Sequence, residues 1–373
     1  MKLHLTSLGG DHYQLGLQQG KAARKSIHKL LESLTEFKVY KYLKPKWLPS
    51  PVFLYLAKRR ASNQLEKDIP KYYPRQAERL RGLAEGSEID LSTLLFLQSF
   101  ELLIGAPRYK VEACTAIGFS AQKTMNSEVI LVKNFDYLND LEPYQVAYKA
   151  APDGCYRTLG FTISPLPCML EGMNEHGLSV TYNLAYTTDK PSCYVPLSMV
   201  IQEMLETCRD TDEAVKYLRE AKRGGHDAIL TIVDPSGDFR SVEITSNHIA
   251  TRKMEKDYLI NANQFQTSEM KRYEIPHNAV SLIDGTRVHE SSEERMKRIH
   301  VLLKNKNKVD EGDIIAILRD HGPEDKPSAN TICRHDEIAS TLRSMIYHPE
   351  KRTIKALHGR ACINEYQEIK LQS

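Results

Sequence analysis

The feature that most constrains this chain is a change in its hydrophobic pattern at Cys114. Before that cysteine, apolar residues recur at the spacing of amphipathic helices, most clearly over 13–35, 74–85 and 91–104. After it, short β-rich runs separated by turn signals follow one another as far as residue 183. Because strands and helices come in separate runs, the pattern predicts an α+β protein rather than regular βαβ winding.

The same patterns assign the elements that follow Cys114. Strands are expected over 114–120, 128–135, 143–150, 157–163, 166–172, 177–183, 227–234, 239–246, 248–253 and 258–262. Helices are expected over 196–208, 211–223, 291–305 and 310–320, and closing strands over 329–334, 340–347 and 352–357.

Composition narrows the classes of function. The 373 residues include 51 Lys and Arg against 48 Asp and Glu, a formal charge of +3, which argues against a general nucleic-acid binder. No stretch approaches the ~18 uncharged apolar residues of a membrane span, and the N-terminus lacks the apolar core of a secretory signal. The 7 cysteines are scattered without a C-x-x-C pair, which is typical of reduced thiols. We therefore expect a cytoplasmic protein, and the oligomeric state is not fixed by the sequence.

Common catalytic and metal-binding motifs are missing from the sequence. It has no GxxxxGK[ST] loop, no HExxH, no GxSxG elbow and no Rossmann glycine pattern. Two His/Asp pairs, Asp320-His321 and His335-Asp336, offer ligands or bases, but no second pair stands at metal spacing. We expect these pairs to be structural, and we expect neither a metal nor an organic cofactor.

Cys114 is a candidate nucleophile because it stands at the first residue of a predicted strand hairpin. If the peptide bond before it is cut, the new α-amino group lies beside the cysteine's own thiol. An α-amine has a reference pKa of about 8, so it can act as a general base at neutral pH. Lys133 and Asp136 on the partner strand can orient amine and thiol, and asparagines on other strands can form an oxyanion hole.

The stretches around these residues resemble a known family. CTAIGFS, followed by VILVKNFDY, looks like the start of the mature chain in N-terminal-nucleophile hydrolases of the acyl-CoA:6-aminopenicillanic acid acyltransferase type. That family is similar to choloylglycine hydrolases, which include penicillin V acylase, and to acid ceramidase. Further blocks that resemble the family lie in its order at 172–183, 260–265, 291–295, 318–321 and 332–335.

The resemblance implies a four-layer αββα sandwich and a chain divided in two. Residues 1–113 would be a helical pro-segment that stays bound as a small chain after cleavage between Ala113 and Cys114. Residues 114–373 would be the catalytic chain. The residue before the nucleophile is Ala113, where the penicillin acyltransferase commonly has Gly, and its small size keeps cleavage plausible.

The resemblance also implies roles for single residues. Cys114 would be the nucleophile, Asp136 would lie beside its amine and thiol, and Arg295 would support it. Asn183 and Asn263 would hold the amine and the oxyanion.

Three more positions are implied around these residues. Lys133 stands where choloylglycine hydrolases carry Arg, and a cation there would lower the pKa of the thiol. Phe135, Tyr137 and Gln264 are expected to contact substrate, with Gln264 in place of the His of the family's T-N-H-F block.

Each catalytic candidate also has an ordinary structural reading. Cys114 can be one more buried thiol, and Asp136 can cap a turn. Asn183 and Asn263 can be strand-end or turn asparagines. Arg295 can form a surface ion pair with a Glu of its own helix.

The implied activity is hydrolysis of a linear N-acyl amide through a thioester on Cys114. One alternative is an acyltransferase that moves an acyl group from acyl-CoA or an acyl carrier protein to an amine, and another is a non-catalytic scaffold. The segment 37–65 is rich in Lys, Arg and aromatic residues and has no acidic residue. It is either a solvated arm or a docking patch for an anionic partner such as coenzyme A, a carrier protein or a membrane surface.

Overall fold

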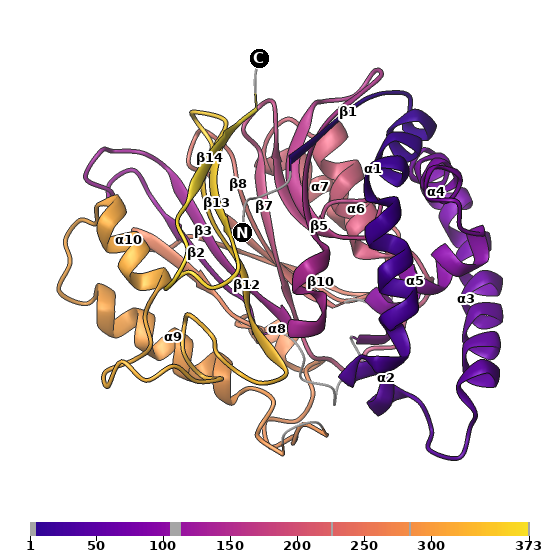
Figure 1. The fold of residues 1–373 in the computed structure, drawn as a ribbon. Coiled ribbons are helices and arrows are strands. Elements are labelled where there is room, and N and C mark those ends of the chain that lie inside the picture. Colours follow the sequence, from indigo (N-terminus) through magenta and orange to yellow (C-terminus); the bar gives the residue numbers. More distant parts are fainter. Residues whose placement is uncertain (1–4, 105–112, 225–226, 283–284, 372–373) are drawn as a thin grey trace.

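The computed structural model describes residues 5–104, 113–224, 227–282 and 285–371, and shows two stacked β-sheets with helices on both outer faces (Figure 1). The N-terminal part contains β1 (Leu5–Gly10), α1 (His12–Ser33), α2 (Lys38–Leu43), α3 (Ser50–Tyr72), α4 (Pro74–Ser87) and α5 (Leu91–Ile104). Among these residues, no helix combines the length and the apolar character that crossing a membrane requires.

The two sheets differ in strand order. The 8-stranded sheet has the order β1-β4-β5-β6-β7-β8-β9-β10, with β4 (Gln145–Pro152), β5 (Thr158–Ile163), β6 (Glu171–Asn174), β7 (Ser179–Leu184), β8 (Ala228–Val233), β9 (Arg240–Ile244) and β10 (Ile249–Lys253). The 6-stranded sheet has the order β11-β2-β3-β12-β13-β14, with β11 (Tyr258–Asn261), β2 (Thr115–Phe119), β3 (Ile130–Leu138), β12 (Ala339–His348), β13 (Thr353–His358) and β14 (Gln367–Lys370). The later helices are α6 (Leu197–Thr207), α7 (Thr211–Glu220), α8 (Ser268–Lys271), α9 (Glu290–Leu303) and α10 (Glu311–Leu318).

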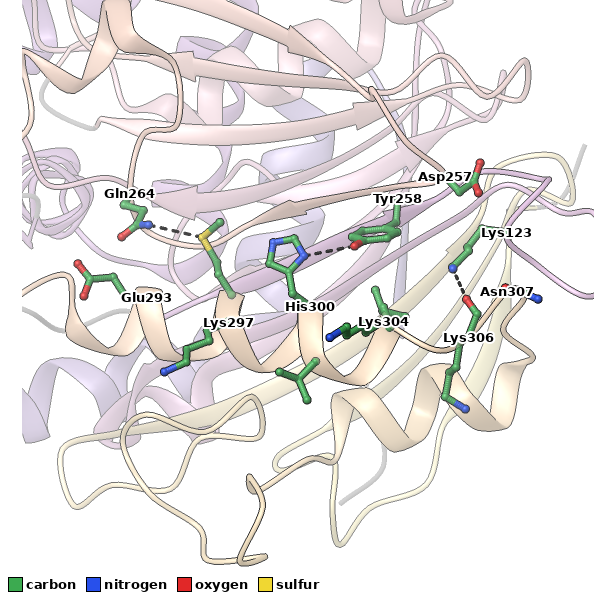
Figure 2. A pocket seen from close by; sticks show the side chains of 13 residues that line it. Lys123, Asp257, Tyr258, Gln264, Glu293, Lys297, His300, Lys304, Lys306 and Asn307 are labelled. Atoms are coloured by element: carbon green, nitrogen blue, oxygen red, sulfur yellow. Dashed lines mark hydrogen bonds between the residues drawn. The ribbon is translucent and has the colours of Figure 1, made fainter.

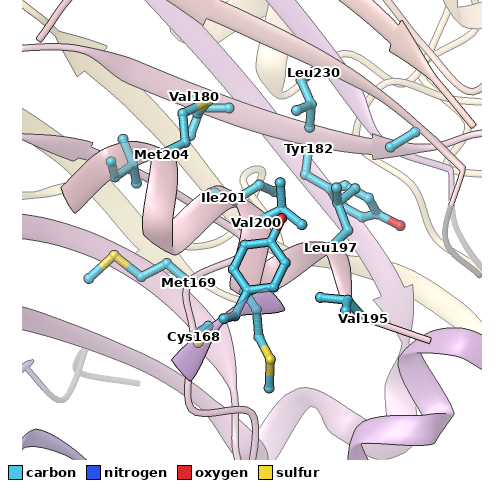
Figure 3. Packing of buried hydrophobic residues seen from close by; sticks show 14 of the residues in the cluster. Cys168, Met169, Val180, Tyr182, Val195, Leu197, Val200, Ile201, Met204 and Leu230 are labelled. Carbon is cyan, nitrogen blue, oxygen red and sulfur yellow. The ribbon is translucent and has the colours of Figure 1, made fainter. Parts of the chain in front are cut away.

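Alternation along the strands sorts the apolar side chains into three layers. Leu230 of β8 packs with α6 in one outer layer, which Figure 3 shows from close by. Phe161 of β5 and Met345 of β12 meet between the sheets. Val132 of β3 packs with Ile299 of α9 in the other outer layer. The molecule is therefore the αββα sandwich that the resemblance predicts.

Helices α1 and α4 touch backbone to backbone. A Cβ on Gly16 of α1 would stand 1.9 Å from the carbonyl oxygen of Arg79, and a Cβ on Gly82 of α4 would stand 2.0 Å from that of Tyr13. No side chain fits at either position, so this close packing requires glycine on both helices. It joins the N-terminal helices into one layer outside the 8-stranded sheet (Figure 1).

The structure corrects several sequence-based expectations. The N-terminal part is not wholly helical, because β1 pairs parallel with β4 at the edge of the 8-stranded sheet. The strand expected over 329–334 is wrong: this stretch is irregular, and the main-chain amide of Cys333 donates to the oxygen of Asp320 at 3.1 Å instead of joining a ladder. Strand β14 was missed because its 4 residues are too few to show a period.

Candidate active site

Cys114 lies directly before β2, at one end of the β2–β3 hairpin, and its side chain is fully buried. The antiparallel register pairs Thr115 with Asn134, which places the preceding cysteine beside Phe135 and Asp136 of β3. The Cys114 thiol donates a long contact of 3.8 Å to the main-chain oxygen of Asp136. The hairpin thus fixes where the thiol stands, because the strand ladder holds the residues on either side of it.

The carbonyl oxygen of Cys114 is held by two side chains, one from helix α9 and one from strand β7. Arg295 Nη1 of α9 donates to it at 2.6 Å, and Asn183 Nδ2 of β7 donates at 2.9 Å. This carbonyl follows the Ala113–Cys114 peptide bond in the chain. Neither of these two contacts involves the Ala113–Cys114 bond itself.

Arg295 is the centre of a buried network. Its Nη1 also donates to Thr115 Oγ1 at 2.6 Å, and its Nη2 donates to Asn263 Oδ1 at 3.0 Å. Asn263 in turn donates from Nδ2 to the main-chain oxygen of Leu184 at 2.8 Å. Because Arg295 is fully buried, the reading of a surface ion pair with its own helix is wrong. Asn263 lies two residues after the end of β11 and is itself buried.

Lys133 fixes the orientation of the Asn183 amide. Its ammonium donates to Asn183 Oδ1 at 2.8 Å and to the main-chain oxygen of Tyr182. Since Lys133 has no acceptor, Asn183 must present its oxygen to the lysine and its NH₂ group to the Cys114 carbonyl. Lys133 and Asp136 are three residues apart in one strand, so their side chains lie on opposite faces of the hairpin.

Asp136 is a buried carboxylate of which only one oxygen has a hydrogen-bond partner among the described residues. Its Oδ1 accepts from Thr341 Oγ1 at 2.7 Å, whereas Oδ2 is buried without a hydrogen-bond partner among the described residues. Burial raises the pKa of Asp136 to about 6, against the attraction of Arg295. Burial also lowers the pKa of Arg295 to about 10, so desolvation outweighs the attraction between the two charges. A cation beside Oδ2 would give this oxygen the hydrogen-bond partner that it lacks among the described residues.

Thr341 is a site residue to which the sequence analysis assigned no role. It pairs with Asp136 where the register between β3 and β12 shifts, a β-bulge between Thr341 and Arg343. Bulges re-aim side chains, and here the hydroxyl meets the carboxylate. Only the sheet pairing shows what this residue contacts.

Of the three residues expected to contact substrate, Phe135 and Tyr137 lie side by side and Gln264 lies apart from them. Phe135 is buried between the sheets, with the Arg343 guanidinium 4.7 Å from its ring centroid and the Tyr137 ring at 5.5 Å. Phe135 therefore packs in the core. Gln264 lies elsewhere, half-buried, with its Nε2 3.6 Å from Met296 Sδ.

Gln264 is one of the residues that line a groove between β11 and α9 (Figure 2). The charged side chains that line it are mostly basic: Lys123, Lys297, His300, Lys304 and Lys306, against Asp257 and Glu293. Tyr258 and His300 join across it at 3.3 Å. Because Gln264 follows Asn263 in the chain, the groove begins next to the Arg295 network.

The fold and the grouping of these side chains define a class: an αββα sandwich with a cysteine at the first position of an inner hairpin, bordered by Asp, Asn and Arg. The chain belongs to the acyl-coenzyme A:6-aminopenicillanic acid acyl-transferase family, whose sequence model matches residues 123–361. The predicted family resemblance is thereby confirmed.

Individual relatives are distant. The chain is 25% identical to Protein dcd1A of Dictyostelium discoideum over 272 residues, which is 66% of this chain and 59% of that protein. It is similar in fold, with a TM-score of 0.45 and 15% identity, to the Caenorhabditis elegans ortholog of N-acylethanolamine-hydrolyzing acid amidase, over 64% of this chain and 93% of that one. Penicillin V acylase from Agrobacterium tumefaciens matches with a TM-score of 0.43 and 15% identity, over 69% and 86% of the two chains.

Proposed function

We propose that this protein is a self-processing cysteine amidohydrolase that cleaves linear N-acyl amides through a thioester on Cys114. The observation that carries the proposal is the anchoring of the Cys114 carbonyl by Arg295 and Asn183. This anchor lies on the far side of the bond to be cut. It would therefore keep the new α-amine beside its own thiol.

Processing comes first in this proposal. The Cys114 sulfur attacks the Ala113 carbonyl carbon, the C–N bond breaks as the C–S bond forms, and the nitrogen takes up the proton. Water then hydrolyses the thioester, which leaves a carboxylate on Ala113 and a free α-amine on Cys114. Ala113 is buried, so the bond lies inside the protein and water must reach it for the second step.

Turnover then uses the same atoms. The α-amine takes the thiol proton, the thiolate attacks the substrate carbonyl, and the departing amine of the substrate receives that proton. Water hydrolyses the acyl-enzyme. Asp136 Oδ2, buried without a partner, would accept from the α-ammonium that forms during each cycle. Asn263 stands beside Arg295 and can reorient to donate to the oxyanion.

The first test is the intact mass of the purified protein under denaturing conditions. Cleavage before Cys114 would divide the 42.6 kDa chain into species of roughly 13 and 30 kDa, by share of residues. The larger species would begin at Cys114, and Cys114→Ala would stay whole. A chain that remains whole in active protein would overturn the processing step. A panel of linear N-acyl amides, followed by detection of the acyl-enzyme mass on the larger species, tests turnover.

The basic groove favours the acyltransferase as a second candidate. Four lysines and a histidine line it, and it begins one residue from Asn263. Such a groove attracts phosphate groups, and a phosphate-bearing acyl donor fits it better than a neutral amide does. Lys297→Glu with Lys304→Glu would then raise the KM for acyl-CoA and leave that for a neutral N-acyl amide unchanged. Equal effects on both substrates would remove this support.

The role of the basic aromatic segment 37–65 as a docking patch remains a prediction. It folds into α2, the following turn and the first part of α3, and it leaves Trp47 81% exposed and Tyr55 62% exposed. Lys58 donates to Thr93 Oγ1 at 2.7 Å, so that ammonium serves the helix layer. The segment therefore combines exposed aromatic rings with several cations, of which Lys58 already has a local partner.

A further inference from the structure

Four potential metal ligands, none of which contacts the carbonyl of Cys114, lie together in the structure. His321 follows α10, Cys333 and His335 lie in the irregular stretch before β12, and Cys362 follows β13. Their ligand atoms all lie within 4.8 Å of one another. Three separate segments thus deliver two thiols and two imidazoles to one point.

The three distances from His335 Nε2 to the other ligand atoms are close to the edges of a tetrahedron. His335 Nε2 lies 3.2 Å from His321 Nε2, 3.4 Å from Cys362 Sγ and 3.7 Å from Cys333 Sγ. A tetrahedral zinc with ordinary Zn–N and Zn–S bonds places its ligand atoms about 3.3–3.8 Å apart. The three distances therefore follow the expected order, with nitrogen nearest and sulfur farthest.

Hydrogen bonding alone does not explain the convergence. A neutral imidazole nitrogen carries either one proton or one lone pair, so His335 Nε2 can make one strong hydrogen bond. It has three close neighbours, and two of them are sulfur atoms, which are weak partners. One ion shared by all four atoms would satisfy every one of these contacts.

The surroundings hold the ligands as metal sites usually do. His321 Nδ1 lies 3.1 Å from Asp325 Oδ1, and a carboxylate on the second nitrogen leaves Nε2 bare for an ion. Arg319 Nε donates to the main-chain oxygen of Ala361 at 2.8 Å, which ties the segment before His321 to the segment before Cys362. The positions are therefore set by the fold before any ion arrives.

We propose that His321, Cys333, His335 and Cys362 bind one Zn²⁺ ion in a closed tetrahedral site. Two thiolates and two imidazoles are the ligand set that suits zinc, and four protein ligands leave no open position for catalysis. The two thiolates also cancel the charge of the ion.

The proposed role is structural and local to the active site. Arg334 stands between two ligands, and its main-chain amide donates to Thr341 Oγ1 at 2.9 Å. The same hydroxyl donates to Asp136. An ion that fixes the stretch around Arg334 would thus fix the hydroxyl that orients the carboxylate.

The test is a titration of the reduced, chelator-treated full-length protein with Co²⁺, followed by displacement with Zn²⁺. We expect one Co²⁺ per chain, with the strong visible bands of a tetrahedral ion and a thiolate charge-transfer band, and loss of both on adding Zn²⁺. The double variant Cys333→Ser/Cys362→Ser should lose these bands. The matched control Cys193→Ser/Cys208→Ser, which changes two other buried cysteines, should keep them.

A second variant protects the test against misfolding of the double cysteine variant. Asp325→Asn, at an exposed carboxylate, should weaken metal affinity by roughly tenfold while the protein stays folded. Absence of stoichiometric Co²⁺ binding by the folded wild-type protein would overturn the proposal. A Cys333–Cys362 disulfide in protein purified without oxidant would overturn it as well, and so would equal binding by the double cysteine variant.

Discussion

Two clusters that contain thiols lie around the same sheet, and their neighbours differ in kind. Around Cys114 the neighbours are hydrogen-bond donors and charges, with Arg295 and Asn183 fixing its carbonyl. Around Cys333 and Cys362 the neighbours are imidazole nitrogens, which offer lone pairs. Donors that hold the backbone leave a thiol able to react, whereas lone pairs that converge on one point suit an ion. Cysteine chemistry here is therefore set by the groups around the sulfur.

The largest expected effect separates the two clusters by activity. Cys114→Ala should leave the chain uncut and lower kcat/KM for an N-acyl amide by at least about 10³-fold, because it removes the attacking atom. Cys333→Ser, assayed in the presence of an excess of reductant, should still be cut. The measurements are denatured mass and amide turnover. Processing in Cys114→Ala, or its loss in a folded Cys333→Ser, would break the comparison.

The next effect concerns charge at the first cluster and is measured in the uncut Cys114→Ala protein. Burial raises the pKa of Asp136 from 3.8 to about 6, so the folded form binds its proton more tightly than the unfolded form does. The contribution of this carboxyl to the free energy of unfolding should therefore fall as pH rises from about 4 through 6.

Adding Asp136→Asn to that protein removes this titration. At pH 7.5 the double variant should be more stable than Cys114→Ala by up to about 3 kcal/mol, and near pH 4 the two should be alike. Urea unfolding at both pH values measures the difference. A double variant that is less stable than Cys114→Ala at pH 7.5 would show a carboxylate stabilised by its surroundings, which is the opposite assignment.

The third effect tests the second cluster through stability. A chelator that strips zinc should lower the free energy of unfolding of the wild-type protein by about 2.7 kcal/mol if the free ion had stood at 100 times its Kd. The Cys333→Ser/Cys362→Ser variant should show no response to the chelator. Thermal unfolding with and without added Zn²⁺ gives the comparison. A response of equal size in both proteins would place the ion elsewhere.

The smallest effect sharpens the role of Lys133. Lys133→Met leaves Asn183 Oδ1 without its donor, and an unsatisfied buried acceptor costs about 1–3 kcal/mol. We expect slower processing and turnover, by roughly tenfold or more, because the amide can then turn away from the Cys114 carbonyl. Lys133→Arg restores a donor and should recover most of the rate. Rates in Lys133→Met equal to those of the wild-type protein would show that the amide needs no such support.

Much of the fold follows from local pattern. Period-two runs predicted the hairpin of β2 and β3, and three- and four-residue spacing predicted α1, α4 and α5, because each of these elements buries one face or both. The pattern was wrong over 329–334, where Ile332 and Cys333 are β-prone but their backbone is held by loop contacts. Edge strand β1 was missed because a short edge strand shows too little alternation.

The sequence by itself marked Cys114. Its place at the change in hydrophobic pattern and the ordered blocks around it can both be read along the chain. It also named Lys133, Asp136, Asn183, Asn263 and Arg295 by resemblance, and the structure brings all of them to the start of β2. Tertiary structure alone decided that Lys133 turns the Asn183 amide and that a bulge aims Thr341 at Asp136. It alone joined His321 to Cys362. Contacts between segments far apart in the chain depend on sheet register and loop packing, and no local pattern encodes those.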